Sequence, residues 1–248
     1  MTAPATMPPL PDGYTLHRFE TLDGTNAEAL RAGALPGTVY IARRQTSGRG
    51  RQGRDWQSPD GNLYATICIQ PPENRNPAQL AFVAGLAVLD AVSEAAPGAE
   101  FSLKWPNDIL AGDGKVSGIL IEAGDHGYAV GIGINIVSSP PPGEVRYPAS
   151  NLSDFTGQTP DPELLLAVLC RHFDTWYHRW TKDGFEPLRA VWLASAHRMG
   201  DTIAASTGVD RIEGRFQGLD ADGALVLEDA GGVVHIVTAG DVFFPGAD

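Results

Sequence analysis

A segment rich in glycine and arginine, residues 48–56, has the residue types that bind an anion. It reads Gly-Arg-Gly-Arg-Gln-Gly-Arg-Asp-Trp. Glycines let the backbone approach a ligand and turn its N–H groups inward, and arginines offer permanently charged, bidentate donors to phosphate or carboxylate. The spacing matches neither a Walker A loop nor a dinucleotide-binding loop. We expect the loop to close when an anion binds, because its glycines make ordering costly otherwise.

A second segment places two lysines near a carboxylate. Lys104-Trp105-Pro106-Asn107-Asp108 ends a predicted strand, and Lys115 opens the next one. Proline, Asn and Asp favour a bend, so a hairpin is predicted to return Lys115 toward Asp108. The lysine would neutralise charge on a phosphoryl-bearing intermediate, and the carboxylate would accept a proton or help to hold a metal. The alternative is an ordinary hairpin with a surface ion pair.

A third segment, Gly131-Ile132-Gly133-Ile134-Asn135, alternates glycine with isoleucine. Alternate glycines in a strand indicate that another group approaches that face closely. Asn135 at the strand end is suited to bind a heterocycle or a ribose, and core packing explains the pattern equally well.

The elements that must position these segments follow from apolar periodicity. Strands are predicted at residues 14–20, 38–42, 62–70, 101–104, 115–122 and 128–137, and helices at 24–31, 77–96, 162–181 and 187–196. Residues 46–60 are predicted to form a long loop. From residue 199, short β-like runs and an Asp-Ala-Asp-Gly turn predict a small β-barrel. We expect a disordered lead-in at 1–12, an α+β domain with a mixed sheet at 13–198, and the barrel at 199–248.

The charge distribution is uneven. The 248 residues carry a formal net charge of -12, yet residues 43–54 hold five of the 18 Lys and Arg residues. An acidic chain repels nucleic acid, so RNA binding through the arginines is the weaker hypothesis. No apolar stretch approaches the ~20 residues of a membrane span, and no signal peptide is recognisable. Cys68 and Cys170 are expected to be buried free thiols. We therefore expect a cytoplasmic protein that binds neither membrane nor nucleic acid.

Taken together and in this order, these segments resemble the biotin–protein ligase family. The resemblance runs from Tyr14 to Val242 and includes Gly214–Asp220, which resembles the family's SH3-like C-terminal barrel. It implies a catalytic domain of the biotin/lipoate ligase type. It also implies a two-step reaction, in which biotin and ATP form biotinyl-5′-adenylate and a carrier lysine then takes the biotin. A lipoate or octanoate ligase or transferase, which shares the fold, is the alternative.

The resemblance also implies roles for individual residues. Lys115, Arg49 and Asp108 would be catalytic, with Lys115 binding the carboxylate and the α-phosphate and Asp108 accepting the proton of the acceptor lysine. The biotin site would comprise Thr25, Asn26, Gln45, Gly48, Arg49, Lys115 and Gly118. The ATP and adenylate site would comprise Arg51, Arg54, Trp56, Asn107, Lys115 and Asn135, with Trp56 covering the adenine. Mg²⁺ would accompany the triphosphate, and the sequence alone identifies no metal ligands.

The resemblance further implies a partner, the biotin carboxyl carrier protein of an acyl-CoA carboxylase. Both a monomer and a homodimer occur in the family, so a homodimer stays open. Some members carry an N-terminal DNA-binding domain, whereas about a dozen residues precede the first predicted strand, so no operator binding is expected. Gly24 and Gln52 depart from the family pattern, which often has Ser and Arg there. A hydroxyl donor to the biotin head group is therefore expected to be missing.

Overall fold

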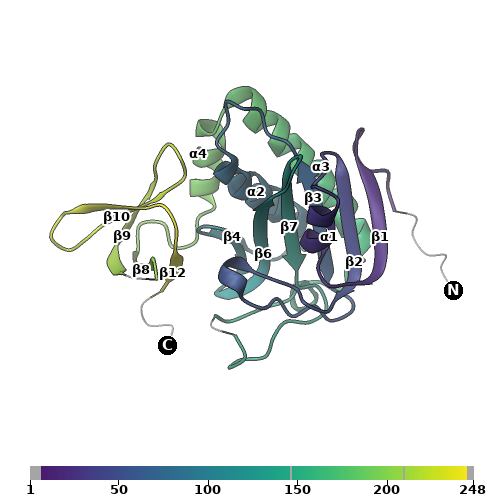
Figure 1. The fold of residues 1–248 in the computed structure, drawn as a ribbon. Coiled ribbons are helices and arrows are strands. Elements are labelled where there is room, and N and C mark those ends of the chain that lie inside the picture. Colours follow the sequence, from purple (N-terminus) through teal and green to yellow (C-terminus); the bar gives the residue numbers. More distant parts are fainter. Residues whose placement is uncertain (1–6, 146, 209, 245–248) are drawn as a thin grey trace.

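The computed structural model describes residues 7–145, 147–208 and 210–244, and its architecture is shown in Figure 1. The predicted disordered lead-in therefore lies in part, at residues 1–6, outside the described residues. The elements form one large mixed sheet with helices on both faces, followed by a smaller antiparallel sheet.

The large sheet has seven strands in the order β1-β2-β3-β7-β6-β5-β4. Their bounds are β1 Thr15–Leu22, β2 Thr38–Gln45, β3 Leu63–Ile69, β4 Phe101–Lys104, β5 Asp108–Ala111, β6 Gly114–Ala123 and β7 Tyr128–Ile134. Strands β1 and β2 pair in parallel, and every other pair is antiparallel. The mixed sheet predicted from the sequence is confirmed.

The helices are α1 Thr25–Arg31, α2 Leu80–Ala95, α3 Pro162–Asp183 and α4 Glu186–Ala194, and short 3-10 turns lie at Arg51–Gly53, Pro77–Gln79 and Leu152–Phe155. Successive side chains of a strand point to opposite faces of a sheet. On one face Tyr40 and Ala129 pack with Ala29 of α1. On the other, Ile41 and Val130 join the main core with α2 and α3. The sheet therefore has a thick core on one side and only the short α1 on the other.

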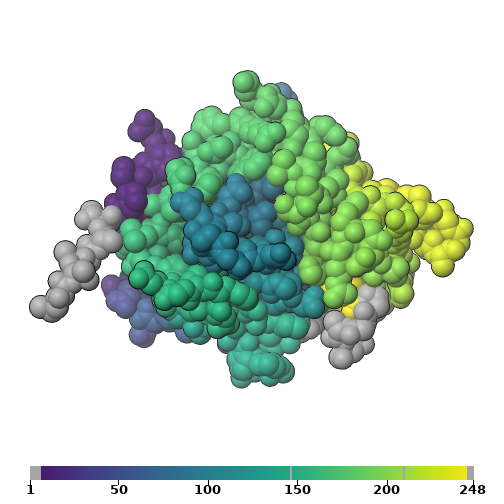
Figure 2. Space-filling view, turned by 180° about the vertical axis from the view of Figure 1, so that it is seen from behind, coloured from purple at the N-terminus to yellow at the C-terminus, as the bar shows by residue number. Residues whose placement is uncertain are grey.

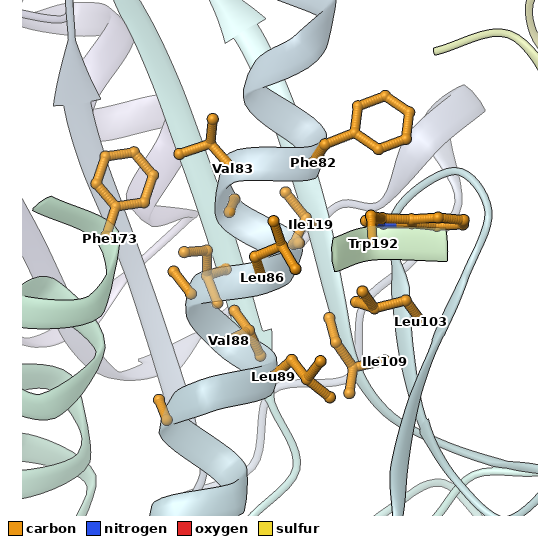
Figure 3. Close-up of a cluster of buried hydrophobic side chains, with 14 of the residues drawn as sticks. Phe82, Val83, Leu86, Val88, Leu89, Leu103, Ile109, Ile119, Phe173 and Trp192 are labelled. Carbon is orange, nitrogen blue, oxygen red and sulfur yellow. The ribbon is translucent and has the colours of Figure 1, made fainter. Parts of the chain in front are cut away.

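Helix α2 is the centre of the main core. Figure 3 shows its side chains Phe82, Leu86 and Leu89 on the side that faces Trp192 of α4 and the sheet, and Val83 on the side of Phe173 of α3. Contrary to the expectation from the sequence, the stretch Pro77–Ala95 is long and apolar enough to cross a membrane by length and composition, and most of it is buried inside the protein. A helix that is apolar all round is also what the interior of a large core requires.

The smaller sheet has five antiparallel strands in the order β11-β10-β9-β8-β12. Their bounds are β8 Thr202–Ser206, β9 Arg211–Leu219, β10 Leu225–Glu228, β11 Val234–Val237 and β12 Asp241–Phe243. Within residues 202–208 and 210–244 no strand pairing joins β11 to β12. The antiparallel strands predicted for this domain are confirmed, and their closure into a barrel stays a prediction. Figure 2 shows this yellow-green to yellow region packed against the body, with its yellow tip projecting. The domain boundary at residue 198 stays a prediction.

Three local predictions have clear outcomes. The bend expected at Asn107-Asp108 leads into a strand that the sequence did not predict, β5, which lies between β4 and β6. Helix α1 begins at Thr25, one residue after its predicted start, and Gly24 is its N-cap residue, with no side chain that caps the helix. Both cysteines are free and buried, as predicted.

Candidate active site

A cavity of about 350 Å³ opens on the α1 face of the large sheet. Twelve of the predicted site residues line it: Thr25, Asn26, Gln45, Arg49, Arg51, Arg54, Trp56, Asn107, Asp108, Lys115, Gly118 and Asn135. They come from α1, β2, the arginine loop, and strands β5, β6 and β7 with the residues directly beside them, which the strand order brings together. Gly48 is the exception. A Cβ there would meet the Trp56 carbonyl oxygen at 2.5 Å, so Gly48 supports the loop from behind the cavity wall.

The floor of the cavity consists of glycines. Gly118 of β6 pairs with Gly133 of β7, and Gly131 lies two residues before Gly133 on the same face. A Cβ at Gly131 would lie 2.3 Å from Asn26 Oδ1, and one at Gly133 would lie 2.5 Å from the Trp56 ring. Since those distances are impossible for real atoms, the close approach predicted from the glycine alternation is confirmed.

The Asn26 side chain makes three hydrogen bonds within the protein. Its amide nitrogen donates to Glu122 Oε2 at 2.9 Å and to the Leu120 carbonyl oxygen at 3.2 Å. Its Oδ1 accepts a hydrogen bond from the Thr66 hydroxyl at 2.7 Å. Both amide hydrogens are thus donated inside the protein, and Oδ1 has a lone pair left for a ligand.

Gln45 links α1 to the arginine loop. Its Oε1 accepts hydrogen bonds from the Thr25 backbone N–H at 2.9 Å and from the Thr25 hydroxyl at 3.3 Å. Its Nε2 donates to the Ser58 hydroxyl at 2.9 Å, which in turn donates to the Trp56 carbonyl. A change in the position of Trp56 would therefore be transmitted to the start of α1.

One carboxylate lies between two lysines. Lys115 Nζ is 2.6 Å from Asp108 Oδ1, and Lys104 Nζ is 3.8 Å from Asp108 Oδ2. The hairpin prediction that Lys115 returns toward Asp108 is confirmed. Lys104 is only 5% exposed and lies 3.6 Å from the centroid of the Tyr147 ring. Burial lowers the pKa of Lys104 to about 8, and the nearby Asp108 carboxylate opposes that shift.

Two asparagines hold the backbone around these charges. Asn107 Nδ2 donates to the Ile119 carbonyl oxygen at 2.6 Å, while its Oδ1 accepts from Arg51 at 3.2 Å. Asn135, 3% exposed, donates to the carbonyl oxygens of Lys115 at 3.3 Å and Ser150 at 3.1 Å. The structure therefore shows both asparagines bonded within the protein, where the sequence suggested direct contacts with a ligand.

The three loop arginines have carboxylate partners within the protein. Arg49 Nη2 lies 3.7 Å from Glu122 Oε1. Arg51 Nη1 lies 3.8 Å from Asp241 Oδ1, and Arg54 forms a close ion pair with the same Asp241. Asp241 belongs to β12 of the smaller sheet, so both sheets contribute to the cavity wall.

The Trp56 ring lies on the glycine floor. It is the nearest group to a Cβ built at Gly133 and among the nearest at Gly118, and Lys115 Nζ is 5.3 Å from the ring centroid. Its indole nitrogen is buried without a hydrogen-bond partner among the described residues. Trp56 and Lys115 therefore lie over the side of Gly118 where a side chain would point, since a Cβ there would be 3.0 Å from the Trp56 ring and 2.9 Å from Lys115 Nζ.

Several lining residues were not singled out from the sequence. They are Tyr64, Pro140, Glu144, Val145, Tyr147, Ala149 and Asp241. The Pro-Pro-Pro-Gly run at residues 140–143 is typical of a surface loop and carries no signal of a binding site. The segment after it is fixed by backbone pairing, since the Lys115 N–H donates to the Pro148 carbonyl oxygen at 2.8 Å. Such a contact between a strand and a distant loop leaves no local sequence signal.

Within the described residues, no group of three or more His, Cys, Asp or Glu side chains is arranged to hold a metal ion. The carboxylates at the cavity are Asp55, Asp108, Glu144 and Asp241. Mg²⁺ is commonly held by one or two carboxylates together with substrate phosphates, so this wall suits a metal that arrives bound to a nucleotide.

Known protein families match this chain over both the large and the smaller sheet. Residues 22–136 match the model of the biotin/lipoate A/B protein ligase family, and residues 202–244 match that of the biotin protein ligase C-terminal domain. A biotin–[acetyl-CoA-carboxylase] ligase of Paracoccus denitrificans is 42% identical over 236 residues, covering 90% of this chain and 98% of the relative. A protein of the same name from Mycobacterium tuberculosis is 34% identical, covering 88% and 84%.

A solved structure supports the same grouping. The biotin protein ligase of Aquifex aeolicus, solved in complex with biotin and ATP, superimposes with a TM-score of 0.83 at 30% sequence identity. The match covers 92% of this chain and 97% of the Aquifex chain.

Proposed function

This chain belongs to the biotin/lipoate A/B protein ligase family and is an ATP-dependent biotin–protein ligase, and we propose that Lys115 is the central cation of its reaction. One observation carries the proposal. Lys115 Nζ lies 2.6 Å from Asp108 in a cavity that has a glycine floor and three arginines along its wall. That arrangement offers a flat apolar surface to a ring and several cations to an acid and its phosphate.

In the first step, a carboxylate oxygen of biotin attacks the α-phosphorus of ATP. A new P–O bond forms, the bond to the bridging oxygen breaks, and pyrophosphate leaves. Lys115 stabilises the charge that develops on the α-phosphate oxygens, and Arg51 and Arg54 bind the phosphates. Arg49 lines the biotin tail and its carboxylate.

In the second step, the amine of the carrier lysine attacks the carbonyl carbon of biotinyl-5′-adenylate and AMP leaves. Asp108 accepts the proton of that amine. In the unliganded protein Lys115 holds Asp108 Oδ1. When Lys115 binds the anionic adenylate instead, that oxygen becomes available to the incoming amine.

Thr25, Asn26 and Gln45 lie at the end of the cavity nearest α1, where we place the ureido head of biotin. The Asn26 oxygen and the Thr25 hydroxyl supply polar contacts, and Gly118 packs against the biotin ring. A Cβ built at Gly24 has no neighbour nearer than 3.8 Å, so space for the serine that many family members have there is present. Trp56, Asn107 and Asn135 border the part that we assign to the adenylate.

We propose that ATP enters as its Mg²⁺ complex, with the metal held mainly by the phosphates. The proposed protein substrate is the lysine-bearing domain of a biotin carboxyl carrier protein, since the relatives named above act on acetyl-CoA carboxylase. We propose that the protein is cytoplasmic and that it binds neither nucleic acid nor membranes. We also propose a homodimer, which would pair through the exposed edge strand β1. The net charge of -12 supports the absence of nucleic acid binding.

The test is exchange of labelled pyrophosphate into ATP, run with biotin, lipoate and octanoate in parallel. Exchange is expected with biotin alone. It would be followed by transfer of biotin to a purified carrier domain, detected by mass. Exchange that depends on lipoate or octanoate, or no exchange with any of the three acids, would contradict the proposed function.

A further inference from the structure

Among the described residues of the smaller sheet, Asp241 at the start of β12 contributes the single carboxylate that lines the cavity. Strand pairing fixes its position. Asp241 pairs with Ser206 of β8, and a Cβ at the preceding Gly240 would lie 2.5 Å from the Ser206 carbonyl oxygen. Because Gly240 allows β12 to run this close to β8, the Asp241 side chain has a defined place beside the arginine loop.

Two arginines of the loop contact Asp241 or Gly240, although they lie far from these residues in the sequence. Arg54 pairs closely with Asp241 Oδ2, and Arg51 Nη1 lies 3.8 Å from Oδ1. Arg51 Nη1 also donates to the Gly240 carbonyl oxygen at 3.1 Å and to Asn107 at 3.2 Å. The Asp241 side chain is only 14% exposed, so these charge contacts are partly shielded from water.

The loop itself has few other contacts near its tip. Its backbone closes through a hydrogen bond from the Gly50 N–H to the Arg54 carbonyl oxygen at 2.7 Å, and an ideal Cβ at Gly53 would meet nothing within 4 Å. A glycine-rich segment of this kind has high conformational entropy to lose on ordering. A fixed carboxylate that holds two of its arginines lowers that loss before any ligand arrives.

We propose that Asp241 is a positioning residue for the arginine loop, holding Arg51 and Arg54 at the cavity before ATP binds. The triphosphate then meets two guanidinium groups already assembled, and their remaining N–H donors bind it. The inference extends the proposed function, because it assumes that Arg51 and Arg54 bind phosphate. It assigns the smaller sheet a part in nucleotide binding through one side chain.

The test compares Asp241→Asn with Glu213→Gln, which removes an equal charge from an exposed position of the same sheet. Two readouts are needed: the rate of tryptic cleavage after Arg51 and Arg54 in the unliganded protein, and the steady-state constants of pyrophosphate exchange. Asp241→Asn is expected to speed loop cleavage and to raise the KM for ATP, each roughly tenfold, as for loss of a charge-assisted contact. The KM for biotin and kcat should change less than about threefold.

Three further outcomes bear on the proposal. Asp241→Glu should restore most of the ATP affinity, and it serves as the test of the same contact if the Asn variant does not fold. In an Arg51→Ala, Arg54→Ala background, Asp241→Asn should have no further effect on the KM for ATP. Additive effects would mean that Asp241 acts through other groups and would overturn the proposal.

Unchanged cleavage and unchanged KM in Asp241→Asn would also overturn it. So would a lower KM for ATP, since Asp241 would then compete with phosphate for the arginines. If the wild-type chain shows no biotin-dependent exchange, the proposed function fails, while the cleavage experiment still decides whether Asp241 orders the loop.

Discussion

At the scale of single residues, the site depends on three charged side chains that lie close together, one carboxylate and two lysines. Asp108 contacts Lys115 at 2.6 Å and Lys104 at 3.8 Å, and the two lysines differ in burial. Lys115 lines the cavity, whereas Lys104 is shielded by Tyr147. We therefore assign Lys115 to the chemistry and Lys104 to the support of Asp108.

Lys115→Met should reduce biotin-dependent pyrophosphate exchange by roughly 10³-fold, because it removes the cation that stabilises the transition-state charge. The matched control is Lys182→Met, at an exposed lysine near the end of α3, which should retain wild-type exchange. Exchange by Lys115→Met within about tenfold of wild type would remove Lys115 from its central role.

Lys104 predicts a specific pH dependence of stability. Its pKa is about 8 in the folded protein, whereas 10.5 is the ordinary pKa of a lysine, so between these pH values the unfolded state binds more protons. Below pH 8 the buried amine is charged, and its burial lowers the free energy of unfolding by the full amount. As the pH rises from 8 to 10.5 the buried amine is neutral, and the free energy of unfolding increases. Between those limits, wild type should gain on the order of 3 kcal/mol of unfolding free energy relative to Lys104→Met.

Urea unfolding of both proteins from pH 7 to 10.5 measures that difference, since groups that titrate alike in both cancel. Lys182→Met, which removes an exposed lysine, should follow wild type across the range. A constant difference between wild type and Lys104→Met would show that Lys104 titrates outside this window. The charged groups that act on Lys104 are Asp108, Lys115, Asp241 and Arg54.

At the scale of elements, strand β7 makes room for the site because its glycines have no side chains. Gly131→Ala would place a methyl group 2.3 Å from Asn26 Oδ1, so the Asn26 amide must leave Thr66 and Glu122. The KM for biotin should rise at least roughly tenfold, and the unfolding free energy should fall by about 1–3 kcal/mol. Exchange kinetics and urea unfolding measure the two effects.

Gly98→Ala is the matched control, because a Cβ at Gly98 meets nothing within 4 Å and its backbone needs no positive φ. It should leave both quantities near wild type. An unchanged KM for biotin in Gly131→Ala would mean that the position of Asn26 has no bearing on biotin binding, contrary to the proposed site.

At the scale of the whole molecule, the two sheets share one core. Phe82 of α2 packs edge-on against Phe185 and Trp192, at 5.0 and 5.5 Å between ring centroids. The Trp105 indole N–H donates to the Gly223 carbonyl oxygen at 3.0 Å, which joins the end of β4 to the β9–β10 turn. The same core cluster includes buried residues from both sheets, so we expect them to unfold together.

Gly223→Ala tests this expectation. Gly223 has φ +94°, and a Cβ there would lie 2.5 Å from the Phe82 ring. The substitution should lower the unfolding free energy by roughly 2–4 kcal/mol through backbone strain and displacement of Phe82. Gly232→Ala, with φ +81° and open space, should cost about 1 kcal/mol from the backbone alone.

Circular dichroism and tryptophan fluorescence should report one coincident transition for both variants. Two separated transitions in Gly223→Ala, with the first confined to the smaller sheet, would contradict the shared core.

Most of the local structure and the order of the site segments follow from the sequence by itself. The strand at 62–70, the helix at 77–96 and the hairpin that returns Lys115 to Asp108 depend on apolar periodicity and turn residues, which act over a few positions. The glycine alternation at Gly131 and Gly133 likewise indicated a close approach. Twelve of the predicted site residues line one cavity, because the strand order places their segments side by side on the same face of the sheet.

Only the tertiary structure decided which distant groups meet. It brought Asp241 to Arg51 and Arg54, placed strand β5, which begins at Asp108, between β4 and β6, and placed Trp56 on the glycine floor. Strand order and packing between sheets set these contacts, and neither is encoded in the periodicity of any one segment. A carboxylate that meets its arginines nearly 190 positions away has no local signal, because the two sheets must first share a core.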